Sequence, residues 1–249
     1  MTISAVLFDL GDTLWHMPNP PPVEEVRRET VRRLFDLLRS WGIDPDANKD
    51  LFYLGRDIRL GTEAQMREAY AGDLREPNYG EIALRVAEGK GLTITPEQGD
   101  ELWATWNLGG PFFRRELFAD AVETLEGLRE RGYRLGCVTN RGFGGAAFVE
   151  EVEGHGLSEF FEVLSVSCDL GYMKPHPEIY RHALESMQIE PKETAMVGDS
   201  LRADVAGAQA LGMTAVWRRR PRSREEPNGV QPDFVVDELR ELLELPVFQ

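Results

Sequence analysis

Apolar residues along this chain follow two different periods. Residues 3–8 form a short, mostly apolar run with β-branched side chains, and this run predicts a buried strand because it is too short for an independent helix. From Val23 to Trp41, apolar residues recur at helical spacing between arginines and glutamates, which predicts an amphipathic helix. Helical patterns continue to Trp106, and no strand pattern is convincing between about 17 and 111. The first part of the chain is therefore predicted to be one strand followed by helices.

From about residue 112, helix and strand patterns alternate. The predicted strands are 133–138, 161–166, 194–197, 213–217 and a short one at 234–236. The predicted helices are 119–131, 144–154, 177–187, 203–211 and 237–245. This alternation predicts an α/β fold, Rossmann-like and doubly wound, in which helices cover both faces of a mainly parallel sheet.

Proline and glycine clusters mark the limits of the helical stretch. The segment 15–22 contains Pro18 and Pro20–Pro22 and is predicted to be a stiff exit that neither continues the strand nor starts a helix. Gly109-Gly110-Pro111 closes the other side. We therefore predict an all-helical domain at 17–111, inserted into an α/β core made of 1–16 and 112–249.

Polar residues follow four of the predicted strands. Open α/β sheets bind their ligands at the carboxyl ends of the strands, so these residues are candidates for a site. Taken alone, each cluster also fits a turn or a helix cap. Together, the carboxylates can form an all-oxygen site for a hard divalent cation such as Mg²⁺. The candidates are Asp9, Thr139, Asn140, Lys174, Asp199 and Asp204.

Four motifs in this order resemble those of the haloacid dehalogenase-like (HAD) hydrolase superfamily, in its helical-cap phosphatase type. They are Asp9-x-x-x-Thr13, Thr139, Lys174-Pro175 and Gly198-Asp199-Ser200-x-x-x-Asp204. Any one of them is weak evidence, whereas four in order at predicted strand ends are specific. The resemblance covers the whole core, and the helical insert occupies the place of that family's cap.

The resemblance implies a Mg²⁺-dependent phosphatase acting on a small phosphorylated molecule. It implies that Asp9 attacks phosphorus and forms an aspartyl-phosphate, which water then hydrolyses. It also implies that Lys174 neutralises the carboxylates and the transferring group. The implied metal ligands are Asp9, the backbone carbonyl of Gly11, and Asp199, with Asp204 in support; the implied phosphoryl ligands are Thr139, the Asn140 backbone and Lys174.

Gly11 departs from the family pattern. Phosphatases of this type usually carry a second aspartate there as general acid and base, and such catalysis is worth about 10²–10⁴-fold. Asp12 lies one residue later, where its side chain is expected to point elsewhere. Two alternatives therefore stay open: a 2-haloacid dehalogenase-like hydrolase, which the metal-type cluster at Asp199 disfavours, and a catalytically weak binding or regulatory protein.

Composition limits the choice of partners. A formal net charge of −15 argues against nucleic acid or an anionic membrane as the main partner. Cys137 and Cys168 are interpreted as small core residues in a reducing compartment, and the start of the chain has no signal-like segment, so a cytoplasmic location is expected. The basic run Arg218–Arg224 is interpreted as a solvated loop rather than an anion-binding patch.

Overall fold

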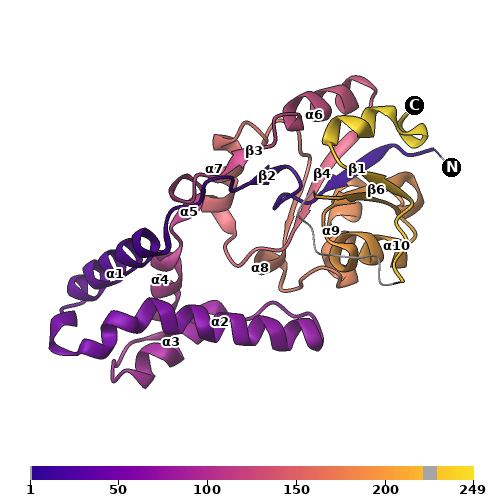
Figure 1. The fold of residues 1–249 in the computed structure, drawn as a ribbon. Helices are drawn as coiled ribbons and strands as arrows, with labels where there is room; N and C mark the ends of the chain where they lie inside the picture. Colours follow the sequence, from indigo (N-terminus) through magenta and orange to yellow (C-terminus); the bar gives the residue numbers. More distant parts are fainter. Residues whose placement is uncertain (1, 221–228) are drawn as a thin grey trace. The chain divides into compact units, whose positions relative to one another are not determined.

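The computed structural model describes residues 2–220 and 229–249. The chain divides into two compact units (Figure 1). The core unit is Met1–Met17 with Glu116–Gln249, and the helical unit is Pro18–Arg115. Both boundaries lie slightly later in the chain than the sequence pattern suggested, and the short helix α5, Gly109–Phe112, belongs as a whole to the helical unit.

The core unit contains a six-stranded sheet in the order β5-β4-β1-β6-β7-β8. Every neighbouring pair in this sheet is parallel, as the helix–strand alternation predicted. The first strand along the chain therefore lies inside the sheet, between two strands from the second half. The strands are β1 (Ala5–Phe8), β4 (Arg134–Thr139), β5 (Leu164–Val166), β6 (Thr194–Gly198), β7 (Thr214–Arg218) and β8 (Phe234–Val236).

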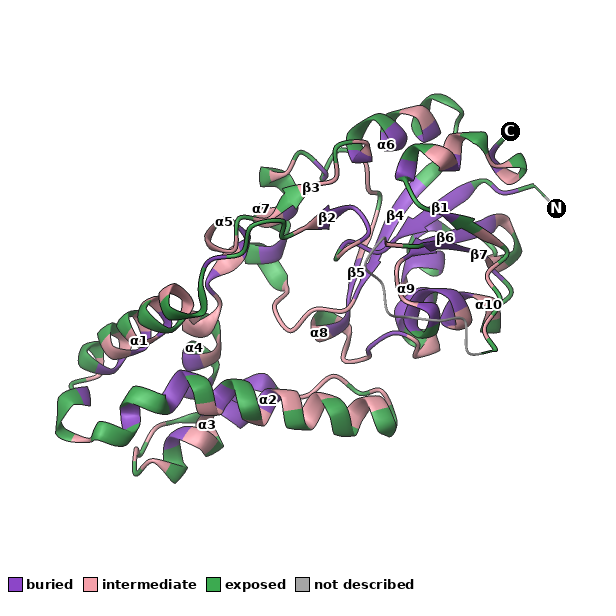
Figure 2. Ribbon diagram, in the orientation of Figure 1, coloured by how far each residue is buried: buried purple, intermediate pink, exposed green. Residues whose placement is uncertain are grey.

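Successive residues of β1 face opposite sides of the sheet. Val6 and Phe8 pack into one apolar cluster with the helices α6, α7 and η5. Ala5 and Leu7 pack into a second cluster with α9, η4 and α10. Both faces are therefore buried, as Figure 2 shows by colour, and this explains why β1 is a continuous apolar run. The helices are α6 (Ala121–Glu130), α7 (Gly145–Gly154), α8 (Ser167–Leu170), α9 (Pro177–Met187), η3 (Pro191–Glu193), η4 (Leu201–Ala206), α10 (Gly207–Ala210), η5 (Leu239–Glu244) and η6 (Pro246–Phe248).

Three predicted elements differ from the observed ones. Residues 203–211 were predicted as one α-helix, but η4 is a π-helix that precedes the short α10. The last predicted helix is a 3₁₀-helix, η5. The prediction that residues 15–22 form no strand is wrong at its start, because β2 (Trp15–His16) pairs antiparallel with β3 (Glu116–Leu117). The first proline of this segment is Pro18, so residues 15 and 16 are free to pair as a strand. The Trp15 side chain is buried in the core cluster.

The helical unit has its own apolar core, formed by leucines, isoleucine and alanines of its helices. Its helices α3 and α4 approach each other closely at two glycines. A Cβ atom on Gly99 would lie 2.6 Å from the carbonyl oxygen of Gly80, so a larger residue would push the helices apart. The elements are α1 (Val23–Ser40), η1 (Pro45–Ala47), η2 (Lys49–Tyr53), α2 (Leu54–Ala71), α3 (Tyr79–Gly89), α4 (Pro96–Trp106) and α5.

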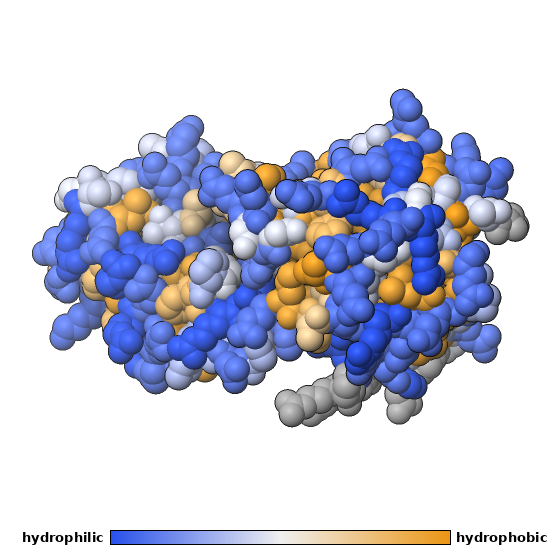
Figure 3. Space-filling view, turned by 90° about the horizontal axis from the view of Figure 1, so that it is seen from above, coloured by the Kyte–Doolittle hydropathy of each residue, from blue (hydrophilic) through white to orange (hydrophobic). Residues whose placement is uncertain are grey.

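Hydrophilic side chains cover most of the face shown in Figure 3, with smaller apolar areas between them. Among the residues that the structure describes, no helix is both long and apolar enough to cross a membrane.

We expect Thr95→Ala to destabilise the helical unit by about 1 kcal/mol. Thr95 and Gln98 form a capping box at the start of α4: the Gln98 N–H donates to the Thr95 hydroxyl, and the Thr95 N–H donates to the Gln98 side chain. Urea unfolding followed by tryptophan fluorescence measures the effect, since Trp103 and Trp106 lie on α4. Thr93→Ala is the matched control, because Thr93 is exposed and precedes the helix. Equal stability of the two variants would show that the cap contributes nothing.

Candidate functional site

A buried lysine lies at the carboxyl edge of the sheet. Lys174 is 2% exposed, and its Nζ donates to Asp9 Oδ1 at 2.7 Å, to Asp204 Oδ1 at 2.7 Å and to the Val138 carbonyl at 2.8 Å. Burial alone would lower the pKa of Lys174, but Asp204 and Asp9 raise it well above its usual value. The lysine is therefore a fixed positive charge with all three protons donated to the protein.

Asp9 follows β1 directly, and its backbone N–H donates to the Val197 carbonyl of β6 at 2.9 Å. This bond keeps the chain in sheet register one residue beyond the strand. The Asp9 carboxylate accepts from Lys174 through Oδ1 and from the Thr13 hydroxyl through Oδ2, at 3.2 Å. Both oxygens are thus oriented, and the residue is 7% exposed.

Asp204 lies on η4 and is fully enclosed. Its Oδ1 accepts from Lys174, and its Oδ2 accepts from the Ser200 N–H at 2.9 Å. Burial raises the pKa of Asp204, although Lys174 opposes the shift. Gly198 makes room for this carboxylate, because a Cβ atom there would lie 2.2 Å from the Asp204 Cγ. Both oxygens of Asp204 are bonded to the protein, so Asp204 is placed to support a metal site rather than to be its main ligand.

Asp199 follows β6 and is held differently. Its backbone carbonyl accepts from the indole N–H of Trp217 on β7, at 2.9 Å. Its carboxylate is not bonded to Lys174 but forms an ion pair with Arg220, between Oδ2 and Nη2 at 3.0 Å. Burial, and then the charges of Asp9 and Asp204, raise the pKa of Asp199 to about 7.

The three carboxylates fit a hard divalent cation. Asp9, Asp199 and Asp204 each offer an oxygen, and these atoms lie within 4.8 Å of one another. The single charge of Lys174 leaves the cluster with an excess of negative charge, which adds to burial in raising the pKa of Asp199. Carboxylate oxygens around a compact, partly dry space are the donors that Mg²⁺ prefers.

Thr139 ends β4 at the same edge of the sheet and is 3% exposed. Its neighbour Asn140 uses its side chain to hold the lysine segment: Nδ2 donates to the Lys174 carbonyl at 3.1 Å, and Oδ1 accepts from the Lys174 N–H at 2.7 Å. The side-chain amide of Asn140 is therefore bonded to the backbone of Lys174 through both its nitrogen and its oxygen. The role predicted for the Asn140 backbone is unaffected.

Comparison with known proteins identifies relatives of this chain. A family model for haloacid dehalogenase-like hydrolases matches residues 3–212. This chain belongs to that family. A glyceraldehyde 3-phosphate phosphatase from Methanopyrus kandleri is 30% identical over 248 residues, covering 98% of this chain and 97% of that protein. A phosphoserine phosphatase from Thermus thermophilus is 36% identical over 180 residues, covering 70% of this chain and 66% of that protein.

Solved structures agree with the family assignment. A HAD phosphatase from Thermococcus onnurineus superposes with a TM-score of 0.58 at 27% identity, covering 98% of this chain and 97% of that one. A 2-haloacid dehalogenase from Pseudomonas syringae superposes with a TM-score of 0.68 at 24% identity, with the same coverage. At that identity the second match shows only that the HAD fold is shared.

Arginines at the end of β7 and just after it contact Asp12 and Asp199, and the sequence interpretation missed them. Arg218 is 4% exposed, and its Nη1 donates to the Asp12 carbonyl at 3.3 Å. Arg220 pairs with both Asp199 and Asp12. The interpretation of 218–224 as a solvated loop is therefore wrong for these two residues, and residues 221–224 lie outside the described part of the chain. Strand-end position was the available signal, because Arg218 is the last residue of β7.

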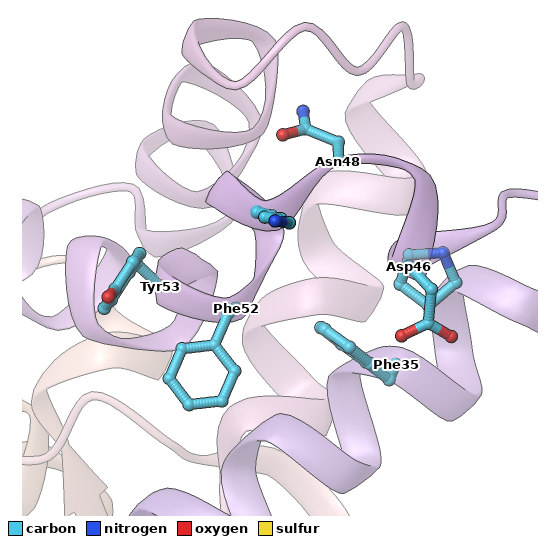
Figure 4. A pocket seen from close by; sticks show the side chains of 7 residues that line it. Phe35, Asp46, Asn48, Phe52 and Tyr53 are labelled. Atoms are coloured by element: carbon cyan, nitrogen blue, oxygen red, sulfur yellow. The ribbon is translucent and has the colours of Figure 1, made fainter.

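The helical unit of this HAD protein carries surface pockets of its own. One of about 350 Å³ lies beside η1 and η2, where Phe35, Phe52 and Tyr53 surround a hollow with Asp46 and Asn48 at its border (Figure 4). None of the predicted site residues lines this pocket. A second pocket, of about 370 Å³, is lined by apolar residues and by Arg27, Arg56 and Arg59.

We expect Asp199→Asn to stabilise the metal-free protein at pH 8 by about 1–3 kcal/mol. Because the pKa of Asp199 is raised to about 7, the folded state binds a proton that the unfolded state has lost between about pH 4 and 7. The stability contributed by this group therefore falls as the pH rises through that window, and the amide removes the penalty. Unfolding in EDTA at pH 5 and pH 8 measures the difference.

Asp237→Asn is the control of opposite sign, because the side-chain hydrogen bond from Arg219 lowers the pKa of Asp237. Its stability should not increase at pH 8. A loss of stability in Asp199→Asn at pH 8 would contradict the crowding of negative charge at the site.

Proposed function

We propose that this chain is a Mg²⁺-dependent phosphatase, which hydrolyses a small phosphorylated molecule through an aspartyl-phosphate on Asp9. The observation that carries the proposal is the cluster of Asp9, Asp199 and Asp204, two of which, Asp9 and Asp204, share the buried Lys174. The names of the curated relatives support it, because they include phosphatases of glyceraldehyde 3-phosphate, phosphoserine and phosphoglycolate.

In the first step a carboxylate oxygen of Asp9 forms a bond to phosphorus, and the bond from phosphorus to the leaving oxygen breaks. In the second step water attacks the phosphorus of the aspartyl-phosphate, releasing inorganic phosphate and restoring the carboxylate. Thr139 and the backbone N–H of Asn140 would bind the phosphoryl oxygens. The helical unit would select the substrate.

Lys174 serves this chemistry mainly by orientation and charge. All three of its protons bind protein oxygens, so it holds the nucleophile Asp9 and the supporting Asp204 in one arrangement. A direct bond from Lys174 to a phosphoryl oxygen would require one of these bonds to open. When bound, Mg²⁺ would neutralise charge on the phosphoryl group, held by Asp9, the Gly11 carbonyl and Asp199 with Asp204 behind them.

Two other functions remain as alternatives. A 2-haloacid dehalogenase would use Asp9 as its nucleophile, but it would give the cluster of three carboxylates no divalent cation to bind. A binding or regulatory protein is favoured only by Gly11, which provides no side chain for proton transfer. Mg²⁺-dependent release of phosphate from an aryl phosphate separates the phosphatase from both alternatives.

Asp9→Asn should lower the rate of phosphate release by at least about 10³-fold, because an amide is not an effective nucleophile towards phosphorus. Steady-state hydrolysis of an aryl phosphate with saturating Mg²⁺ measures the loss. Asp237→Asn, in the same unit but on an exposed segment, is the control for an Asp-to-Asn change. Near wild-type turnover by pure, folded Asp9→Asn would exclude the covalent mechanism.

Gly11→Asp should increase hydrolysis of alkyl phosphates more than that of aryl phosphates. An alkoxide needs a proton as it leaves, whereas an aryl oxide needs little, so a restored general acid favours the poorer leaving group by up to about 10²-fold. The substitution is sterically feasible, because a Cβ atom on Gly11 meets nothing within 4 Å and its φ is not positive. A series of leaving groups measured on both proteins tests the expectation.

Gly11→Asn is the matched control, since it has the same shape without an acidic proton. Equal gains in the two variants would show that the side chain acts by position alone. Fast turnover of a sugar phosphate by the wild type would show that another group supplies the proton.

A further inference from the structure

The three clustered carboxylates are held by two different cations. Lys174 binds Asp9 and Asp204 from inside the protein. Asp199, whose side chain is 18% exposed, is bound instead by Arg220 at the border of the site. The residue with the greatest freedom to rotate is therefore oriented by the second cation.

Arg220 binds one oxygen of Asp199 while it is itself held by Asp12. Its Nη2 is 3.0 Å from Asp199 Oδ2, and its Nη1 is 2.9 Å from Asp12 Oδ2. The planar guanidinium fixes the directions of both bonds at once, which a lysine cannot do. No contact in the described part of the chain occupies Asp199 Oδ1, so that oxygen stays available to a cation.

Asp12 is a rigid anchor for this arginine. Its φ of +58° is a left-handed conformation, which aspartate adopts more readily than most residues. Its backbone N–H donates to the Trp15 carbonyl at 2.7 Å, and its carbonyl accepts from the buried Arg218. The anchor therefore has its backbone bonded on both sides, and its carboxylate is turned towards Arg220.

We propose that Arg220, anchored by Asp12, is a positioning residue that orients Asp199 to bind the divalent cation. This inference rests on the proposed function, because it requires a cation at the cluster. Partners that hold a metal-binding carboxylate commonly contribute 10- to 100-fold to metal affinity.

The alternative is that Arg220 competes with the cation for Asp199. Its position disfavours competition, because the three carboxylates lie within 4.8 Å of one another while Arg220 is in place. The guanidinium takes the side of Asp199 that faces Asp12 and leaves the cluster assembled. The two readings predict opposite changes in affinity when the arginine is removed.

Isothermal titration of the metal-free protein with MgCl₂, at about 0.15 M ionic strength to screen distant charges, tests the proposal. Arg220→Gln should weaken Mg²⁺ binding by about tenfold, and Arg220→Lys should lie between it and the wild type. Asp12→Asn should weaken binding less than Arg220→Gln, and it should add little in the double variant. Arg219→Gln is the matched control. It removes the same charge one residue away, but Arg219 pairs with Asp237 rather than with Asp199.

Melting temperatures in EDTA separate orientation from general damage, and those of Arg220→Gln and Arg219→Gln should be similar. If the two glutamine variants bind Mg²⁺ equally, Arg220 is only a surface partner and the inference is overturned, while the phosphatase proposal stands. Tighter binding by Arg220→Gln than by wild type would show competition and would also overturn it. Failure of the wild type to bind Mg²⁺ would overturn the proposed function, and the positioning role with it.

Discussion

The interaction on which the site depends is the buried ammonium of Lys174. Moving an ion out of water is costly unless partners surround it, and here the partners come from three separate elements: the end of β1, β4 and η4. The sheet must be in register, and η4 must present Asp204, before all three bonds can form. Removing one charged partner of such a pair typically costs about 3–5 kcal/mol, so fold and site are stabilised together.

The single positive charge of Lys174 does not balance the three carboxylates of the site. One buried cation for three carboxylates leaves the metal-free cluster with net negative charge, which adds to burial in raising the pKa of Asp199. Arg220 supplies part of the missing charge at the more exposed side, where its contribution is screened by water. Asp9 is thus held from the interior, whereas Asp199 is held from the border. This division lets the two carboxylates respond separately to what binds between them.

Much of this arrangement could be predicted from the sequence because its signals are local. A continuous apolar run marks β1, and a polar residue at its end marks Asp9. Proline after His176 marks the start of α9, whose predicted bounds agree with the observed ones. The α/β order followed from the alternation of periods.

The remaining features depend on contacts between distant residues. Arg220 lies in a run of basic residues, and such a run is ordinarily solvated; only the distant Asp12 and Asp199 make it part of the site. The left-handed conformation of Asp12 could not be predicted either, because the adjacent Gly11 is the residue for which a positive φ would be expected. The side chain of Asn140 binds the backbone of Lys174, thirty-four positions away, and composition cannot show that.

The pairing of β2 with β3 has a consequence for how this family can vary. These two strands lie where the chain leaves the core unit and where it returns, and they are bonded to each other. With respect to the core unit, the whole helical unit is therefore one long loop whose two ends are held together by the pairing of β2 with β3. The entropy of closing a loop grows only with the logarithm of its length, by about 0.6 kcal/mol for each doubling. An inserted unit that is larger, smaller or differently folded would therefore change the cost of closing this loop only slightly, and the sheet of the core unit would be unaffected.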